Sequence, residues 1–390
     1  MVEKIVIEMK PQNTPYSNPN SNHSSNLIHS NYSIKQIQIN MINRAEEEKI
    51  LKLALLCSEH VLLVGRAGTG KSLLADLFFS HLEGKYYKIQ LSKFIPEEML
   101  FGAINIKALR EEGIIVYNYK GSILDSNYAF LDELFDANDS ILRSLLGVLN
   151  ERVFVRGTFM VRVPLITAVA TANYTRYNEV TEAVIDRFLF QWEVQQLSED
   201  DLYQLYDWEP QYPKTKIPLS IIYQEQRQVS KIVIPDKVKT AHVKISVKLG
   251  FSTRRFYKSI KVLKAQAYLN DREVVKPEDL MVLKYLYKAE KSAVKEAENV
   301  ISEYVNVYVK EQEQLEIISE LEAVYDEVYS NWNEDNLIDC IKKLKKIKQK
   351  LIEMEPVTDK VRDKRNELLS DVKKLHDYLM KKLLEKLGIE

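Results

Sequence analysis

The sequence predicts an α/β protein in which a parallel sheet with crossover helices precedes a purely helical part. Short apolar runs, such as VLLV at 61–64, alternate with helix-forming stretches as far as about Glu193, which is typical of strands joined by helices. Residues 236–290 favour helices, and beyond them glycine is absent until Gly388. Apolar residues recur there about every 3.5 positions, which predicts three long helices folded back as an antiparallel coiled arm.

The composition is that of an ordinary soluble protein and disfavours several classes. The 390 residues include 55 Lys and Arg against 56 Asp and Glu, and a nucleic-acid coat protein would normally be strongly basic. Cys57 and Cys340 are too few for a disulfide framework or a four-cysteine zinc site. No apolar run approaches the ~20 residues of a membrane span, and no secretory signal is visible. We therefore expect a cytoplasmic protein without a membrane span.

We expect four parts along the chain, and the first is rich in Asn, Ser and Pro. Such a segment cannot bury enough apolar surface to fold alone, so ordered structure is expected from about Ile34. The division we expect is 1–40 for the disordered N-terminus, 41–195 for the α/β core, 196–290 for a connecting region and a small helical domain, and 291–390 for the helical arm.

Residues 65–72 read GRAGTGKS and match the phosphate-binding pattern G-x-x-x-x-G-K-[ST]. The pattern lies between a predicted strand and a predicted helix, where backbone N–H groups and the positive helix end can face phosphate oxygens. Lys71 is expected to reach the β- and γ-phosphates of ATP, and Ser72 to bind Mg²⁺. The expected nucleotide-binding residues are Gly65, Arg66, Ala67, Gly68, Thr69, Gly70, Lys71 and Ser72.

Three polar residues follow two later apolar stretches. Asp132 and Glu133 end the run AFL, where a carboxylate lies at the same sheet edge as the phosphate loop. Asp132 is expected to hold Mg²⁺ through water and Glu133 to polarise the attacking water, although two acids also suit the start of a helix. Asn173 ends VPLITAVATAN, and its amide is expected to orient that water. An asparagine that forms a turn is the alternative.

Two basic positions lie further along the chain, and the residues alone leave their roles open. Arg187 belongs to a helix-like stretch, where a surface salt bridge with Asp186 or Glu182 would explain it. Arg254 and Arg255 follow Ser-Thr in FSTRRFYKS, a pattern that also fits a capping turn followed by a solvated basic face.

In this order the motifs resemble those of an AAA+ ATPase, and within that class those of the MoxR family, closest to its regulatory ATPase variant A branch. The resemblance covers about residues 42–290. The stretches that carry it are PEEMLFGAINIKALREEG, FLDELFDANDSILRSLLGVLNERVF, VTEAVIDRFLF and FSTRRFYKSIKVLKAQAYL. Family members usually have Pro-Pro-Gly after the first glycine of the loop, where this chain has Arg66, Ala67 and Gly68. Arg66 then projects toward a neighbour, the nucleotide or solvent.

The resemblance implies an AAA+ core with a small helical lid and assigns a role to each later motif. Asn173 corresponds to sensor 1 and Arg187 to the arginine finger that reaches a neighbouring subunit's ATP. Arg254 corresponds to sensor 2, with Arg255 as the alternative. Residues 102–128 and 151–163 correspond to hairpin insertions, which face the pore or a partner in such rings or else decorate the sheet edge.

The resemblance also implies ATP hydrolysis with ATP and Mg²⁺ as cofactors, in a homo-oligomeric ring that is expected to be a hexamer. The implied role is chaperone-like: remodelling a protein client, or helping a metal cofactor enter one, with a von Willebrand A domain protein as partner. A nucleic-acid-linked motor or restriction-type NTPase is the alternative, and a non-catalytic nucleotide-gated scaffold is a third. The lysine cluster at 342–346 lies between apolar helix positions, which favours a solvated face over a nucleic-acid site.

Overall fold

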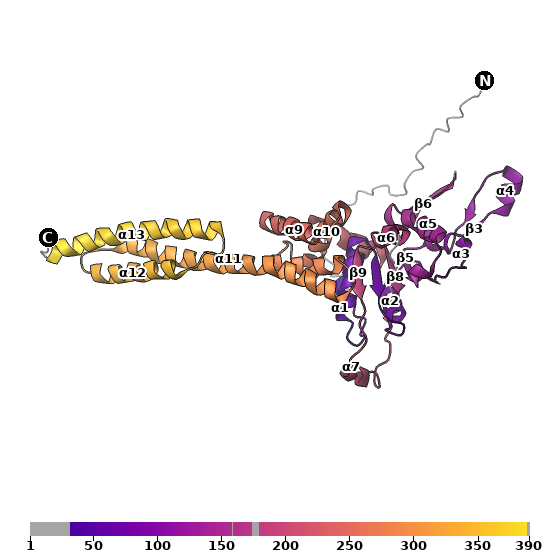
Figure 1. Ribbon diagram of the computed structural model, residues 1–390, viewed down its shortest axis with the longest axis horizontal. Coiled ribbons are helices and arrows are strands. Elements are labelled where there is room, and N and C mark those ends of the chain that lie inside the picture. Colours follow the sequence, from indigo (N-terminus) through magenta and orange to yellow (C-terminus); the bar gives the residue numbers. More distant parts are fainter. Residues whose placement is uncertain (1–31, 158, 174–178, 388–390) are drawn as a thin grey trace, which may run out of the picture. The chain divides into compact units, whose positions relative to one another are not determined.

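A computed structural model describes residues 32–157, 159–173 and 179–387 (Figure 1). Most of the segment expected to be disordered, residues 1–31, lies outside these ranges. Residues 34–40 fall inside the range given to the disordered N-terminus, but Ile34, Ile37 and Ile39 are at most 1% exposed, which agrees with ordered structure from about Ile34. Their burial reflects the apolar positions that follow the Asn/Ser-rich stretch. We call residues 34–44 the N-terminal strap; it begins with the 3-10 helix η1 (Ile34–Gln36).

A five-stranded parallel sheet forms the centre of the α/β core and confirms the predicted fold class (Figure 1). Across the sheet the strands are β2 (Tyr86–Gln90), β5 (Tyr128–Asp132), β8 (Thr167–Ala172), β1 (Val61–Val64) and β9 (Phe190–Glu193). Leu131 lies opposite Ala170, and Val64 lies opposite Ala172. The carboxyl ends of β5, β8 and β1 therefore meet at one edge, where the predicted polar residues follow them.

Both faces of the sheet are covered by helices, because the central strands β5, β8 and β1 are buried on both sides. Val61 and Leu63 of β1 pack into one apolar cluster with α1 (Ala45–Cys57) and α2 (Lys71–Ser80). Leu62 points to the other cluster, which contains α5 (Asp139–Asn150) and α6 (Glu179–Ile185). Shorter elements on the connections are α3 (Glu97–Phe101), η2 (Ile123–Asp125) and η3 (Leu134–Asp136).

Both predicted hairpins are present. β6 (Val153–Arg156) and β7 (Phe159–Arg162) are antiparallel. β3 (Ala103–Ile104) pairs with β4 (Tyr117–Asn118), and the connection between them contains α4 (Ile106–Glu112). Asn105 caps this helix by accepting hydrogen bonds from the N–H groups of Lys107 and Ala108.

Residues 196–290 contain more helix than the sequence analysis expects. The elements are α7 (Glu199–Gln204), α8 (Leu219–Lys231), α9 (Asp236–Lys248), α10 (Thr253–Leu269) and the 3-10 helix η4 (Pro277–Leu286). The prediction of a connecting region over 196–235 is wrong for α8, which packs through Ile222 and Val229. Glu225 lies between them on the buried face and accepts a hydrogen bond from the Ile34 N–H at 3.1 Å. This buried polar residue interrupts the apolar pattern of the helix.

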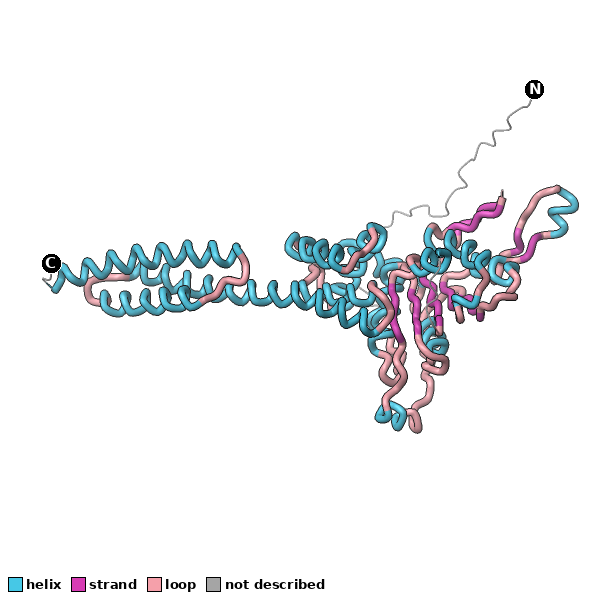
Figure 2. The backbone as a smooth tube through the Cα atoms, in the orientation of Figure 1, coloured by secondary structure: helices cyan, strands magenta, loops and turns pink. Residues whose placement is uncertain are grey.

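The C-terminal part consists of the three predicted long helices, α11 (Lys291–Asn331), α12 (Leu337–Glu353) and α13 (Asp359–Leu387). α12 and α13 lie alongside each other and alongside the C-terminal half of α11 (Figure 2). These parts share an apolar cluster of their own, in which Leu344 and Val372 are fully buried. The first turns of α11 pack elsewhere, because Ala297 and Ile301 belong to the cluster that contains η4 and α10. Among the described residues, no helix combines the length and apolar character that crossing a membrane requires.

We expect that removing the arm leaves the stability of the rest unchanged only when the cut falls after the first turns of α11. A chain that ends at Glu313 keeps the buried side chains of Ala293, Val294, Ala297 and Ile301, whereas one that ends at Lys288 lacks them. That loss corresponds to roughly 5 kcal/mol of apolar burial. Thermal unfolding of the two truncated chains should show a clearly lower midpoint for the shorter one. Equal midpoints would mean that these turns do not support the helical domain.

Candidate functional site

The predicted phosphate loop connects β1 to α2, and its glycines meet two backbone requirements. Gly65 has a φ of 156°, and a Cβ at this position would lie 2.7 Å from the Val194 carbonyl oxygen at the end of β9. Gly70 has a φ of 84° and precedes the first residue of α2. L-residues with side chains rarely adopt such angles. The loop can therefore turn tightly against the sheet and present backbone N–H groups at the helix start.

Lys71 lies at the first position of α2 and folds back across the loop. Its Nζ donates to the carbonyl oxygens of Gly65 at 2.7 Å and Arg66 at 2.9 Å, and lies 3.5 Å from Asn173 Oδ1. Burial lowers the pKa of Lys71, while the carboxylates of Glu133 and Asp132 oppose this effect. An ammonium group in this position can interact with an anion held by the loop.

The predicted acidic and amide residues lie beside this lysine. Ser72 Oγ is 3.5 Å from Asp132 Oδ2. Glu133 follows β5 with a left-handed φ of 54°, and its Oε1 accepts a hydrogen bond from Asn173 Nδ2 at 2.6 Å. The structure thus brings together five side chains that the sequence analysis selects from three separate stretches.

The oxygen groups of Ser72 and Asp132 fit a magnesium ion. Mg²⁺ prefers oxygen ligands and usually retains several waters, taking only one or two protein groups together with substrate phosphates. Over the described ranges no group of three or more His, Cys, Asp or Glu side chains could hold a metal by itself. The hydroxyl and carboxylate are therefore suited to a metal that arrives with a phosphate ligand.

Arg187 and Arg254 lie apart from the loop residues and share one carboxylate. Arg254 Nη1 is 2.6 Å from Asp186 Oδ2, and Arg187 Nη1 is 3.3 Å from the same oxygen. The salt bridge considered for Arg187 from the sequence is thus present. Its Nε is buried and has no hydrogen-bond partner among the residues that the structure describes.

Arg255 is engaged differently from Arg254. Its Nη1 donates to the carbonyl oxygens of Leu286 and Tyr287 at the end of η4, the second at 3.1 Å. Burial lowers the pKa of Arg255. These contacts tie α10 to η4, which leaves Arg254 as the arginine of the pair that faces the core through Asp186.

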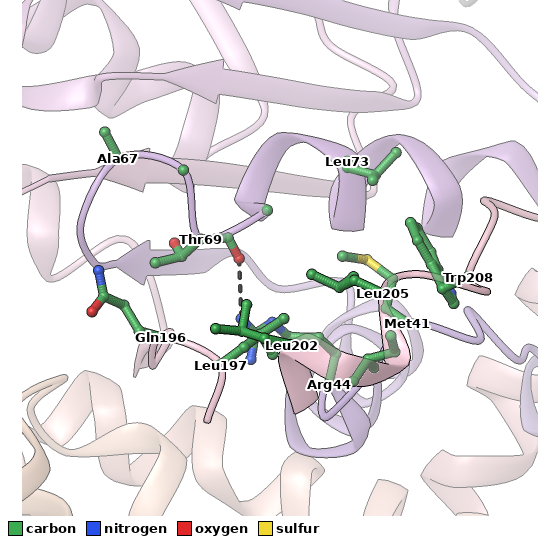
Figure 3. A pocket seen from close by; sticks show the side chains of 13 residues that line it. Met41, Arg44, Ala67, Thr69, Leu73, Gln196, Leu197, Leu202, Leu205 and Trp208 are labelled. Carbon is green, nitrogen blue, oxygen red and sulfur yellow. Dashed lines mark hydrogen bonds between the residues drawn. The ribbon is translucent and has the colours of Figure 1, made fainter. Parts of the chain in front are cut away.

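A cavity of about 420 Å³ opens beside the phosphate loop and was not found from the sequence (Figure 3). Apolar side chains from the N-terminal strap, α2 and the segment around α7 line it. The apolar lining residues are Met41, Ile42, Leu73, Leu197, Leu202, Leu205 and Trp208. Trp208 is held by a hydrogen bond from its Nε1 to the Asn40 carbonyl at 2.6 Å. In the sequence, the apolar residues around α7 are too widely scattered to distinguish this segment from a linker.

Arg44 is a second site residue that sequence reasoning missed. It is 5% exposed, and its Nη2 donates to the Thr69 carbonyl at 3.1 Å and the Gln195 carbonyl at 2.9 Å (Figure 3). This guanidinium therefore ties the phosphate loop to the chain that leaves β9. Because Gln195 is 151 residues away in sequence, no local pattern could reveal the contact.

Comparisons with known proteins match both the α/β core and the helical domain that follows it. Residues 28–226 match the family described as the MoxR domain in the MoxR-vWA-beta-propeller ternary systems, and residues 234–301 match an AAA lid domain. Two uncharacterized proteins of Methanocaldococcus jannaschii are similar to the chain. MJ0812 is 35% identical over 63% of this chain and 68% of its own length; MJ0079 is 31% identical over 76% and 80%.

A solved structure has the same fold. It is the crystal structure of a presumed ATPase from Cytophaga hutchinsonii, with a TM-score of 0.54 at 18% identity. The superposition covers 68% of this chain and 90% of that one. At this identity the likeness concerns the fold alone.

We expect Arg44→Met to destabilise the core, because the phosphate loop and the chain after β9 each lose a hydrogen bond from a charged donor. The cost should be roughly 2–3 kcal/mol, which lowers the thermal midpoint by roughly 5 °C. Arg66→Met is the matched control, since Arg66 is exposed and its side chain makes no ion pair or hydrogen bond within the described residues. If both variants melt together, Arg44 does not support the loop.

Proposed function

Because the chain belongs to the MoxR family of AAA+ ATPases, we propose that it binds ATP with Mg²⁺ and hydrolyses ATP to ADP and phosphate. One observation carries the proposal, the set of polar contacts at the sheet edge. The Lys71 ammonium lies 3.5 Å from Asn173 Oδ1, and Asn173 donates to Glu133 Oε1 at 2.6 Å. Ser72 and Asp132, the sequence neighbours of Lys71 and Glu133, lie 3.5 Å apart through Oγ and Oδ2. Phosphoryl transfer to water needs positioning and charge neutralisation at one point, not a covalent intermediate.

Each side chain has a distinct role in this reaction. The loop N–H groups and Lys71 would hold the β- and γ-phosphates, and Ser72 and Asp132 would hold the metal, Asp132 through water. Bound Mg²⁺ supplies neutralisation of phosphate charge. Glu133 accepts the proton of the attacking water as the water oxygen bonds to the γ-phosphorus and the bond to the bridging oxygen breaks. Asn173 Nδ2 donates a hydrogen bond to Glu133 Oε1. The other carboxylate oxygen, Oε2, is then the one that accepts the proton of the water.

The cavity beside the loop fits the base and ribose of the nucleotide. Its walls are mainly apolar, and the aromatic ring of Trp208 and the side chains of Leu202 and Leu205 border it. A planar heterocycle gains from such surroundings because its faces are removed from water. In this proposal the segment around α7, whose sequence resembles that of a linker, forms part of the nucleotide site.

We propose that the ATPase works as a homo-oligomeric ring, a hexamer, with Arg187 acting on a neighbour's ATP and Arg254 acting as sensor 2. The buried Nε of Arg187 has no partner among the described residues, and its contact with Asp186 is long at 3.3 Å. A phosphate from an adjacent subunit would give this guanidinium an acceptor in addition to Asp186 and the Ala183 carbonyl. Arginine suits this role because its planar fork stays charged and binds phosphate in two places.

The wider role that we propose is chaperone-like remodelling of a protein client, or assistance to metal-cofactor insertion, in the cytoplasm. The matched family is named for ternary systems with a von Willebrand A domain and a β-propeller, which supports a von Willebrand A domain protein as partner. The regulatory ATPase variant A branch stays our proposal for the subgroup. In this scheme, hydrolysis opens and closes the core against the lid.

Lys71→Ala and Glu133→Gln should separate binding from hydrolysis. Lys71→Ala removes the ammonium that faces the phosphates, so it should bind ATP too weakly to measure at micromolar nucleotide. Glu133→Gln keeps the loop intact and should bind ATP as the wild type does, while its turnover falls by about 10²–10⁴ because the general base is lost. Fluorescent-nucleotide titration and phosphate release measure the two effects. Equal binding defects in both variants would contradict these roles.

Arg187→Ala should bind ATP normally but hydrolyse it slowly, because it lacks the finger for its neighbour. An arginine finger supplies a factor of ~10³–10⁵ in other NTPases. Mixing Arg187→Ala with Lys71→Ala subunits should restore part of the phosphate release, since an intact Arg187 then meets an intact ATP site. Native mass spectrometry verifies co-assembly. If phosphate release does not recover in the mixed rings, Arg187 does not act on a neighbour's ATP and serves only as the structural partner of Asp186.

A further inference from the structure

Thr171, on β8, joins the two carboxylate positions of the site and had no role in the sequence analysis. Its side chain is fully buried. Its Oγ1 hydrogen-bonds to Asp132 Oδ1 and accepts a hydrogen bond from the Glu133 N–H at 3.2 Å. Both contacts cross from β8 to the end of β5, so the hydroxyl bridges two neighbouring strands.

The direction of these hydrogen bonds follows from their chemistry. A threonine hydroxyl carries one proton and accepts through its lone pairs. Because the Glu133 N–H can only donate, the hydroxyl proton is available for Asp132 Oδ1. Asp132 Oδ2 is then left facing Ser72 Oγ at 3.5 Å. Thr171 thereby selects which oxygen of the carboxylate faces the phosphate loop.

The backbone at Glu133 makes this bridge possible. Thr171 on β8 contacts Asp132, and Asn173, one residue beyond the end of β8, contacts Glu133. Asp132 and Glu133 are consecutive. Consecutive strand residues would point to opposite faces. Glu133 instead has a φ of 54°, a left-handed conformation that costs about 1–2 kcal/mol in a residue with a Cβ. The Thr171 hydroxyl fixes its N–H in that conformation.

We propose that Thr171 is a positioning residue for ATP hydrolysis, which orients Asp132 for the metal and holds the backbone of Glu133 in place for the water. The inference rests on the proposed ATPase function. In this role Thr171 acts through the two acidic residues. Groups that orient metal-binding side chains in this way typically contribute 10–100-fold to metal affinity or activity.

The test compares Thr171→Val, Thr171→Ser and Thr167→Val in the full-length protein. Valine keeps the shape and removes the hydroxyl, whereas serine keeps the hydroxyl. Thr167 is the matched control because it is also fully buried on β8, and its hydroxyl faces the Ala54 carbonyl at 3.4 Å, away from the acidic residues. The measurements are ATPase rate against Mg²⁺ concentration, fluorescent-ATP binding in EDTA, and thermal unfolding.

Thr171→Val should lower the maximal rate by about 10–100-fold and raise the half-saturating Mg²⁺ concentration, while nucleotide binding in EDTA stays within about twofold of wild type. Thr171→Ser should recover most of the rate. Thr167→Val should keep the wild-type Mg²⁺ dependence even if it melts at a similarly reduced temperature.

Two outcomes would overturn the inference while the wild type is active. One is a Thr171→Val enzyme with wild-type rate and Mg²⁺ dependence. The other is an equal loss of rate in the two valine variants, which would assign the effect to general destabilisation. A wild-type protein that binds ATP but never hydrolyses it would instead refute the proposed function itself, so the two failures are distinguishable.

Discussion

The register between β5 and β8 is the constraint on which the site depends. Leu131 lies opposite Ala170, so the next residues, Asp132 and Thr171, meet at the carboxyl edge of the sheet. Side chains alternate along a strand, and a slip of one residue would turn the hydroxyl and the following amide to the opposite face. The apolar residues on both sides of these strands prevent that slip because each must stay in its own cluster. Packing in the core thus sets the chemistry at its edge.

The parts of the fold and of the site that could be predicted are those marked by a continuous pattern of residues in the sequence. The phosphate loop and the strands before Asp132 and Asn173 are continuous patterns, and their placement at one sheet edge followed from parallel topology. Arg44 escaped prediction because its partners lie far along the chain. Thr171 escaped because a threonine in an apolar strand is an ordinary β-former, and only the register shows what its hydroxyl meets.

Sequence spacing alone could not decide whether Arg254 or Arg255 corresponds to sensor 2. Adjacent helix residues differ by about 100° in direction, so Arg254 and Arg255 must have different surroundings. The structure places one against Asp186 and the other against the carbonyls at the end of η4. Asp186 is adjacent in sequence to Arg187, so the same carboxylate contacts a lid arginine and a core arginine. Any anion that draws one arginine away changes the electrostatic environment of the other.

The N-terminal strap has a mechanical consequence. It is hydrogen-bonded to Glu225 through Ile34 and ion-paired to Asp271 through Lys35, while Met41 borders the cavity beside the phosphate loop. The strap runs directly into α1 of the core, so it joins the lid to the core in addition to the covalent connection after β9 and the ion pairs Arg254–Asp186 and Lys258–Glu59. A change in the angle between lid and core therefore pulls on the strap. Because Met41 of the strap borders the cavity, the same change also moves one wall of that cavity.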